Sequence, residues 1–327
     1  MPDRPLIAIL DRFGVSREVE ETMERLRAAG FAVRRLDWPQ LSFHLDAGLV
    51  DGDGAPVGAC AALVRSRVYT RADDPAAVFD RLDLLGRSGV RVVNNAGSIR
   101  AAHHKALSCA ILHRAAVPVP PTRLISTLQQ AARALADWPE TIFKPVHGHA
   151  GIGHQRMHRM AALEAPGLPA ALAPHQEIAL WHLLRQHGEL CAQRVVPGRD
   201  VRIMVVRDEI VACYRRRELG ADGRPEAYDV ELIDCTPDLA AAARTACRVL
   251  GLDHAAVDLV RDESETADSG PFAVVEVNPS ISFWNHLESA GTHANGRGIG
   301  AAYAAMLAAA AEGALGPRTH SLKVGIP

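Results

Sequence analysis

The sequence predicts a mixed α/β (α+β) fold built from more than one structural unit. Short apolar runs alternate with amphipathic segments over residues 1–97, a pattern typical of parallel strands joined by helices. The last third instead begins with closely spaced β-rich runs at 190–196, 200–206 and 209–215, which we interpret as an antiparallel meander. With 327 residues, the chain is long enough for two or three domains.

The composition excludes several classes of protein. A hydrophobic content of 48%, a charged content of 23% and a net charge of -2 lack the basic excess of a nucleic-acid binder, so we expect no nucleic-acid partner. The six cysteines form no CxxC pair, which favours a reducing compartment. The apolar stretches at 6–10 and 298–311 are shorter than a signal-peptide core and a span of ~20 residues, respectively. We therefore expect a cytoplasmic protein without a membrane partner, and a soluble helix at 298–311.

The first 97 residues read as a small parallel unit. A strand at 6–10, a helix ending at Gly30 and a strand at 31–36 come first. A strand at 60–64, a helix at 75–89 and a strand at 90–94 repeat the order. No GxGxxG follows the first strand, which disfavours a dinucleotide site.

The middle of the chain predicts helices followed by a strand and a glycine-bearing loop. Ser98 is a suitable cap for one helix running to residue 115. A second helix near 127–137 precedes a strand at 141–146 and the loop GHAGIG at 148–153. The pattern over 157–188 is weak and is compatible with a helix.

The last third predicts strands around one helix. Turns at 197–198 and 207–208 join the β-rich runs, and a helix follows between Pro237 and Gly251. Runs at 254–260 and 272–278 flank an acidic loop and predict an antiparallel pair.

Oxygen-bearing side chains lie on that pair of strands. Glu276 and Asn278 share a face because strand side chains alternate, and Asp258 can join them across the hairpin. Such hard ligands suit Mg²⁺. The alternative is that the two carboxylates are unrelated and exposed to solvent. The apolar neighbours Val257 and Val277 make an unpaired charge at these positions unfavourable.

Basic side chains supply candidates for phosphate binding. Lys144 at a strand end, followed by the loop at 148–153, offers a cation and several backbone N–H groups, although a simple hairpin explains the glycines as well. Lys105 and Arg202, taken singly, are typical surface charges. Arg215 and Arg216 could hold an anionic substrate or belong to a solvated strand end.

Histidines crowd the loop and its exit at positions 147, 149, 154 and 158. A transition-metal site is one interpretation. A polar loop near phosphates is the simpler one, because no cysteine or acidic partner completes a recognisable site.

Five segments of the sequence carry a family resemblance. In chain order they are NNAGSIRAAHHKALSCAILHRAAVPVPPT, FKPVHGHAGIG, AQRVVPGRDVRIMVV, GLDHAAVDLV and VVEVNPS. Together they resemble the ATP-grasp superfamily, and within it the RimK-like amino-acid (glutamate) ligases. The resemblance covers roughly residues 90–290. It implies an ATP-grasp fold with an N-terminal Rossmann-like pre-ATP-grasp domain at 1–97, a central lid subdomain with the Gly-rich loop at 98–188, and a C-terminal subdomain with the Mg²⁺ site at 189–327.

The resemblance also implies roles for individual residues. Lys105 and Lys144 would bind the α- and β-phosphates of ATP, and the loop with Gly148, Gly151 and Gly153 would close over the triphosphate. Arg202 would contact the γ-phosphate and an acyl-phosphate intermediate, and Arg202 and Lys144 would be the catalytic residues that offset the charge developing during transfer. The remaining implied residues are the adenine-binding hinge at Gln193, Val195 and Val196 and the Mg²⁺ ligands Asp258, Glu276 and Asn278, with Mn²⁺ as a possible substitute.

This sequence departs from the family pattern at several positions. Arg194 replaces the usual acid of the hinge, and His149 stands where serine is frequent. The stretch 217–232 lacks the Asn and Gly-Gly often found after the meander, which puts recognition of the acceptor in doubt.

The implied function is ATP-dependent carboxylate–amine ligation through an acyl-phosphate, with glutamate as the leading candidate for the amino acid added to a small carrier or peptide. A small-molecule kinase and a non-catalytic nucleotide-binding regulatory protein are the alternatives. By analogy with the family, we expect a homo-oligomer, a dimer or a tetramer. The two substrates and the number of residues added do not follow from the sequence.

Overall fold

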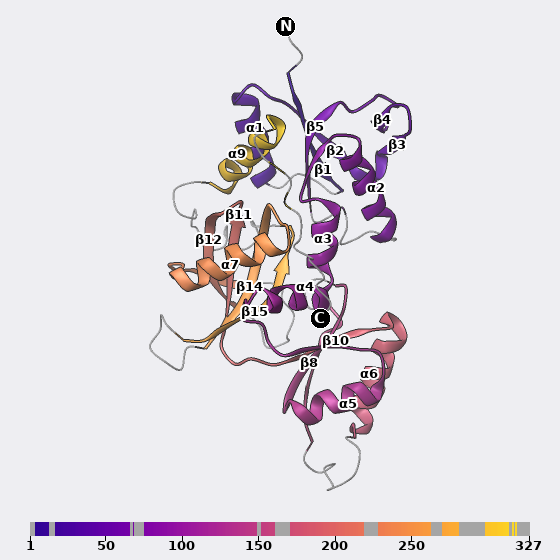
Figure 1. The fold of residues 1–327 in the computed structure, drawn as a ribbon, viewed down its shortest axis with the longest axis vertical. Helices are drawn as coiled ribbons and strands as arrows, with labels where there is room; N and C mark the ends of the chain where they lie inside the picture. The colour runs from indigo at the N-terminus through magenta and orange to yellow at the C-terminus, as the bar shows by residue number, and fades with distance from the viewer. Residues whose placement is uncertain are drawn as a thin grey trace.

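The computed structural model describes residues 4–12, 17–65, 68, 75–148, 152–160, 171–218, 228–262, 270–280, 298–313, 316 and 318. Along the long axis of the molecule, Figure 1 shows a parallel α/β unit, then a sheet formed by β11, β12, β14 and β15 with their neighbours, then a second antiparallel unit around β8 and β10.

The N-terminal unit is a parallel sheet with the strand order β2-β1-β5-β6. The predicted strand–helix–strand repeats are confirmed, because buried apolar runs form the strands and amphipathic segments form the helices. The elements are β1 (Leu6–Asp11), α1 (Arg17–Ala28), β2 (Ala32–Asp37), β5 (Ala59–Val64), α2 (Pro75–Arg87) and β6 (Arg91–Val93). A 3-10 turn η1 (Trp38–Gln40) and the hairpin β3 (Ser42–His44) and β4 (Gly48–Val50) were not predicted.

The predicted single helix from Ser98 to residue 115 is wrong. The segment forms α3 (Ala96–His103) and α4 (Lys105–Arg114), with an extended backbone at His104 between them. The His104 side chain accepts a hydrogen bond from the backbone N–H of Leu107 and so caps α4, while Asn95 rather than Ser98 caps α3. The break makes Lys105 the first residue of a helix.

The next sheet has the order β7-β10-β8-β9 and is antiparallel, with α5 and α6 packed against it. The predicted helix near 127–137 and strand near 141–146 are confirmed, and a helix occupies part of 157–188. The elements are β7 (Thr122–Ile125), α5 (Leu128–Asp137), β8 (Glu140–Pro145), β9 (Gln155–His158), α6 (Pro174–His187) and β10 (Leu190–Arg194).

The predicted meander is wrong at its first strand. β10 pairs with β7 and β8, so Pro197 and Gly198 lead the chain from one sheet into the next instead of turning a hairpin. The sheet that contains β8 therefore continues to Arg194, beyond residue 188.

The last sheet is antiparallel with the order β13-β12-β11-β14-β15. Its elements are β11 (Arg199–Val206), β12 (Glu209–Glu218), β13 (Tyr228–Leu232), α7 (Pro237–Val249), β14 (His254–Arg261) and β15 (Phe272–Asn278). The predicted hairpin at 207–208, the helix after Pro237 and the pairing of 254–260 with 272–278 are confirmed.

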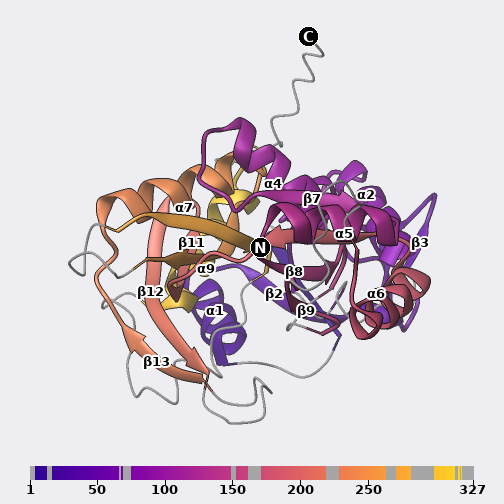
Figure 2. The same ribbon diagram turned by 90° about the horizontal axis from the view of Figure 1, so that it is seen from below.

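The two faces of this sheet are covered differently, as Figure 2 shows for α7 and α9. Val201, Ile203 and Val205 pack with α7 and α4, whereas Met204 and Val206 pack with α9 (Ile299–Ala311). The helix α9 also packs on α1, so the 298–311 helix joins the last sheet to the N-terminal unit. No helix of the described ranges is long and apolar enough to cross a membrane.

Candidate active site

Three strands of the last sheet place charged side chains in one row. Arg202 of β11 is paired in register with Asp258 of β14, which is paired with Glu276 of β15. Side chains opposite one another in paired strands point to the same face. These three residues share the face on which Met204 packs against α9, further along β11.

Arg202 and Asp258 form a two-pronged ion pair. The Arg202 Nε donates to Asp258 Oδ1 at 2.5 Å, and Nη2 donates to Oδ2 at 2.7 Å. Asp258 also accepts from Asn278 Nδ2 at 3.0 Å and lies 3.3 Å from Arg216 Nη2. Burial opposes the charge of Arg202, but the attraction and hydrogen bonds of Asp258 outweigh it and raise the pKa of Arg202.

Lys105 brings the start of α4 to the same row. Its Nζ lies 3.1 Å from Glu276 Oε1 and donates to the Gly148 carbonyl at 3.0 Å. Its backbone N–H donates to the carbonyl of Val146 at 3.1 Å. Lys105 thus links β15 to the entry of the glycine-bearing loop.

A second buried cation lies on the antiparallel sheet of β8 and β10. Lys144 Nζ donates to Gln193 Oε1 at 2.8 Å, and Gln193 Nε2 donates to Thr122 Oγ1 at 3.2 Å. Both side chains of the pair are almost fully buried. A buried ammonium group needs such polar partners, because the free energy of burying an unpaired charge is strongly unfavourable.

The hinge residues follow directly on this pair. β10 ends at Arg194, whose side chain is exposed, and its backbone N–H donates to the Pro121 carbonyl. The N–H of Val195 donates to the Glu140 carbonyl at 3.0 Å, and Val195 and Val196 are half-buried. The segment therefore connects the sheet of Lys144 to the sheet of Arg202.

The glycine-bearing loop is described at its two ends, while His149 and Gly151 lie outside the described residues. Gly153 has a positive φ of 76°, and a Cβ there would come within 2.9 Å of Pro145 Cγ. Only glycine fits this turn without strain. The Gly148 carbonyl is the one that Lys105 contacts.

The described histidines near the loop do not gather into a metal site. His147 stacks on His103 and meets His104 edge-on, and burial, together with nearby His104 and Lys105, lowers its pKa. Burial, with Lys144 and Lys105 close by, lowers the pKa of His154 to about 4. No group of three or more His, Cys, Asp or Glu suited to a metal occurs within the described ranges.

Arg215 and Arg216 of β12 point to opposite faces. Arg216 lies beside Asp258, whereas Arg215 lies 3.5 Å from Glu231 of β13. Sequence reasoning missed Tyr214, a fully buried residue paired in register with Arg202. Burial raises the pKa of its hydroxyl. The signal was present, because Tyr214 and Arg216 are two residues apart on one strand and must share a face.

The oxygen atoms of this row suit a hard divalent cation. Asp258 and Glu276 supply carboxylates and Asn278 supplies an amide oxygen on adjacent strands. Both carboxylates already contact basic groups, namely Lys105, Arg202 and Arg216. The carboxylates and the basic groups therefore balance one another's charge.

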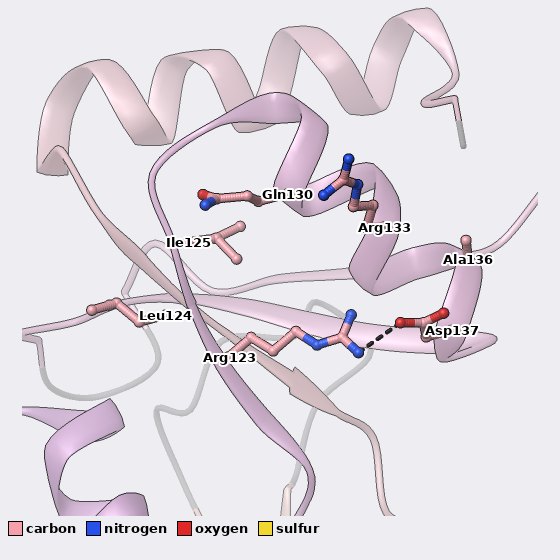
Figure 3. A pocket seen from close by; sticks show the side chains of 7 residues that line it. All are labelled: Arg123, Leu124, Ile125, Gln130, Arg133, Ala136 and Asp137. Atoms are coloured by element: carbon pink, nitrogen blue, oxygen red, sulfur yellow. Dashed lines mark hydrogen bonds and ion pairs between the residues drawn. The ribbon is translucent and has the colours of Figure 1, made fainter. Parts of the chain in front are cut away.

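A separate cavity of about 480 Å³ lies between β7 and α5. Figure 3 shows Arg123 of β7 reaching Asp137 at the end of α5, an ion pair of 2.6 Å. None of the residues singled out in the sequence lines this cavity.

Comparisons with known proteins show which family this chain resembles. The model of the RimK-like ATP-grasp domain matches residues 102–299. The tetrahydromethanopterin:alpha-L-glutamate ligase of Methanosarcina acetivorans is 32% identical over 146 residues, 44% of each chain. The glutathione synthetase of Parasynechococcus marenigrum is 30% identical over 60% of this chain and 62% of its own. This chain thus covers less than two thirds of either relative.

The fold has neighbours among solved structures. The ATP-grasp ligase PsnB, complexed with a phosphomimetic variant of its minimal precursor, Mg and ADP, matches with a TM-score of 0.67 and 19% identity over 94% of this chain and 99% of its own. That likeness shows an ATP-grasp fold. Since the family model also spans more than half of the sequence, the chain belongs to the RimK-like ATP-grasp family.

Proposed function

We propose that this protein is an ATP- and Mg²⁺-dependent carboxylate–amine ligase. The observation that carries the proposal is the row Arg202, Asp258 and Glu276, which Lys105 extends. Its basic side chains suit phosphate oxygens, and its carboxylates suit a metal ion. The relatives and the solved neighbour support the same class, since the Methanosarcina relative and PsnB are named as ligases and the other relative as a synthetase.

The nucleotide would lie between the sheet of Lys144 and the sheet of Arg202. Lys105 and Lys144 would take the α- and β-phosphates, and Gln193, Val195 and Val196 would contact the base. The loop with Gly148, Gly151 and Gly153 would cover the triphosphate and exclude water, which would otherwise hydrolyse an acyl-phosphate. The burial of Lys105 and Lys144 supports these roles, because a charge in a site shielded from water attracts phosphate strongly.

Asp258, Glu276 and Asn278 would hold Mg²⁺, for which Mn²⁺ could substitute. The cation would supply charge neutralisation on the phosphate oxygens. Arg202 would release Asp258 and contact the γ-phosphoryl group as the substrate carboxylate attacks it. The carboxylate oxygen then bonds to phosphorus while the bond to ADP breaks. An amine next attacks the acyl carbon, loses a proton, and inorganic phosphate leaves.

Glutamate is the leading candidate for the amino acid that is added, and a small carrier or peptide for its partner. The Methanosarcina relative supports glutamate by its name, whereas the glutathione synthetase shows that the substrates of relatives differ. Arg216 is the better placed of the two arginines proposed for the substrate, because it lies 3.3 Å from Asp258 and can pair with a carboxylate. Arg215 would act at the periphery.

We also propose a Rossmann-like unit at 1–97, followed by a lid subdomain and a Mg²⁺-binding subdomain. The boundary between the last two lies after Arg194 rather than at the expected residue 188, because β10 pairs with β7 and β8. We further propose a homo-oligomer that resides in the cytoplasm and has no nucleic-acid partner. The near-neutral charge supports the last of these.

The test is ADP formation with ATP and Mg²⁺ across a panel of amino acids and carboxylate acceptors, with mass spectrometry of each positive mixture. A product that gains an amino acid less water supports the ligase and identifies its substrates. A product that gains a phosphoryl group would make the protein a kinase. Tight ATP binding without turnover across the panel would make it a regulatory protein.

A further inference from the structure

The side chain of Asn94 crosses from the N-terminal unit into the last sheet. Asn94 follows β6 directly and is fully buried. Its Nδ2 donates to the carbonyl of Pro279 at 2.7 Å and to that of His254 at 2.8 Å. Its Oδ1 accepts from the backbone N–H groups of Asp253 at 2.6 Å and His254 at 3.2 Å.

These contacts use the full hydrogen-bonding capacity of an amide side chain, two donors and two acceptor lone pairs. They join the start of β14 to the residue after the end of β15. The last backbone pair of these strands is Ala256 with Asn278, and Asn94 bridges the strands just beyond it. The Asn94 side chain of the N-terminal unit therefore extends the hydrogen bonding between β14 and β15 past the last backbone pair.

The bridged ends carry the proposed metal ligands. Asn278 precedes Pro279 directly, and Asp258 lies four residues after His254 on the same face of β14. An ion pair of 2.7 Å between Arg91 of β6 and the buried Asp253 fixes the same junction. The position of β6 thus determines where the two strand ends lie.

We propose that Asn94 is a positioning residue for the cation site, through which the N-terminal unit sets the separation of Asn278 from Asp258. The proposal rests on the assignment of these residues as metal ligands made above. Asn94 touches neither the cation nor the nucleotide, so its effect passes through the backbone of His254 and Pro279. Groups that orient metal ligands typically change metal affinity 10–100-fold when they are replaced.

The experiment is Mn²⁺ binding followed by electron paramagnetic resonance, with the full-length protein saturated by an ATP analogue that has an imido bridge between its β- and γ-phosphates. Asn94→Asp keeps the size and the acceptors of the side chain but loses both donors. Tyr303→Phe is the matched control, because it removes a buried 3.0 Å hydrogen bond to the His254 side chain at the same junction but keeps all four contacts of Asn94 with the backbone of the strand ends. The melting temperature of each variant is measured in parallel.

We expect Asn94→Asp to weaken Mn²⁺ binding by about tenfold or more with unchanged affinity for the metal-free analogue, and Tyr303→Phe to lower the melting temperature without weakening Mn²⁺ binding. Wild-type Mn²⁺ affinity in Asn94→Asp, or equal losses in both variants, would overturn the proposal. Asn94→Ser provides the same comparison if Asn94→Asp does not fold. Failure of Glu276→Gln to weaken Mn²⁺ binding would instead overturn the metal assignment and so the proposed function.

Discussion

Arg202 and Asp258 lie opposite one another on β11 and β14 and form a fork of two hydrogen bonds, at 2.5 and 2.7 Å. The same aspartate is the proposed metal ligand, and the same arginine is proposed for the γ-phosphate. The two side chains therefore neutralise one another. Binding must exchange these contacts, so a nucleotide and a cation should bind more readily together than either does alone.

Removal of Arg202 should make the binding of the cation less dependent on the binding of the nucleotide. In Arg202→Ala, Asp258 loses the closer of its two arginine partners, and we expect Mn²⁺ without nucleotide to bind about tenfold more tightly, because a buried carboxylate with less compensation attracts a cation more strongly. ADP formation should fall by about 10²-fold or more, since a charge directed at the transferred group is lost. Calorimetry with Mn²⁺ alone checks the first effect, and unchanged affinity would contradict the mutual neutralisation of the two side chains.

Glu276→Gln should nearly abolish ADP formation at saturating ATP. The amide keeps the shape but removes the negative charge that a divalent cation requires, and it also weakens the 3.1 Å contact with Lys105. Glu231→Gln is the control, because Glu231 is exposed and pairs with Arg215. Comparable losses of activity in both variants would show that Glu276 has no special role.

Lys144→Gln should raise the KM for ATP by about tenfold or more through the loss of a buried charge near phosphate. The glutamine can still reach Gln193, so the fold should survive. Arg123→Gln, in the separate cavity between β7 and α5, should leave the KM unchanged. Steady-state kinetics with ATP as the varied substrate measures both values.

His254 should make the protein sensitive to mild acid. Burial, with Arg65 nearby, lowers its pKa in the folded protein to about 3. Below pH ~6.5 the unfolded chain takes up a proton there that the folded protein does not, so stability falls as the pH drops and the loss reaches roughly 2 kcal/mol by pH 5. Denaturant unfolding of wild type and His254→Asn between pH 7 and 5 tests this, and we expect the variant to lose less stability over that range.

Much of the site could be predicted because it depends on local rules. Alternation along a strand places Glu276 and Asn278 on one face, and the hairpin brings Asp258 beside them. The pairing of Arg202 with Asp258 could not be derived in this way, because it depends on the register of strands that are distant in sequence. The family resemblance identified both residues but not their mutual contact.

The errors have physical causes as well. β10 lies next to β11 in the chain yet pairs with β7 and β8, and nothing in its apolar pattern specifies the partner strand. His104 ends one helix and caps the next, although histidine is not among the usual capping residues. The sequence showed Asn94 only as the end of a strand. Its four hydrogen-bond partners belong to Asp253, His254 and Pro279, which are too distant in sequence for a local pattern to reveal them.

The central claim is ligation through an acyl-phosphate, and oxygen tracing tests it most directly. Once a carboxylate acceptor has been found, it is supplied with both carboxylate oxygens as ¹⁸O, together with ATP, Mg²⁺ and the amine. The account predicts that the released phosphate carries one ¹⁸O and that the amide product retains the other. Label in AMP, phosphate without label, or a phosphoryl group left on the acceptor would contradict it.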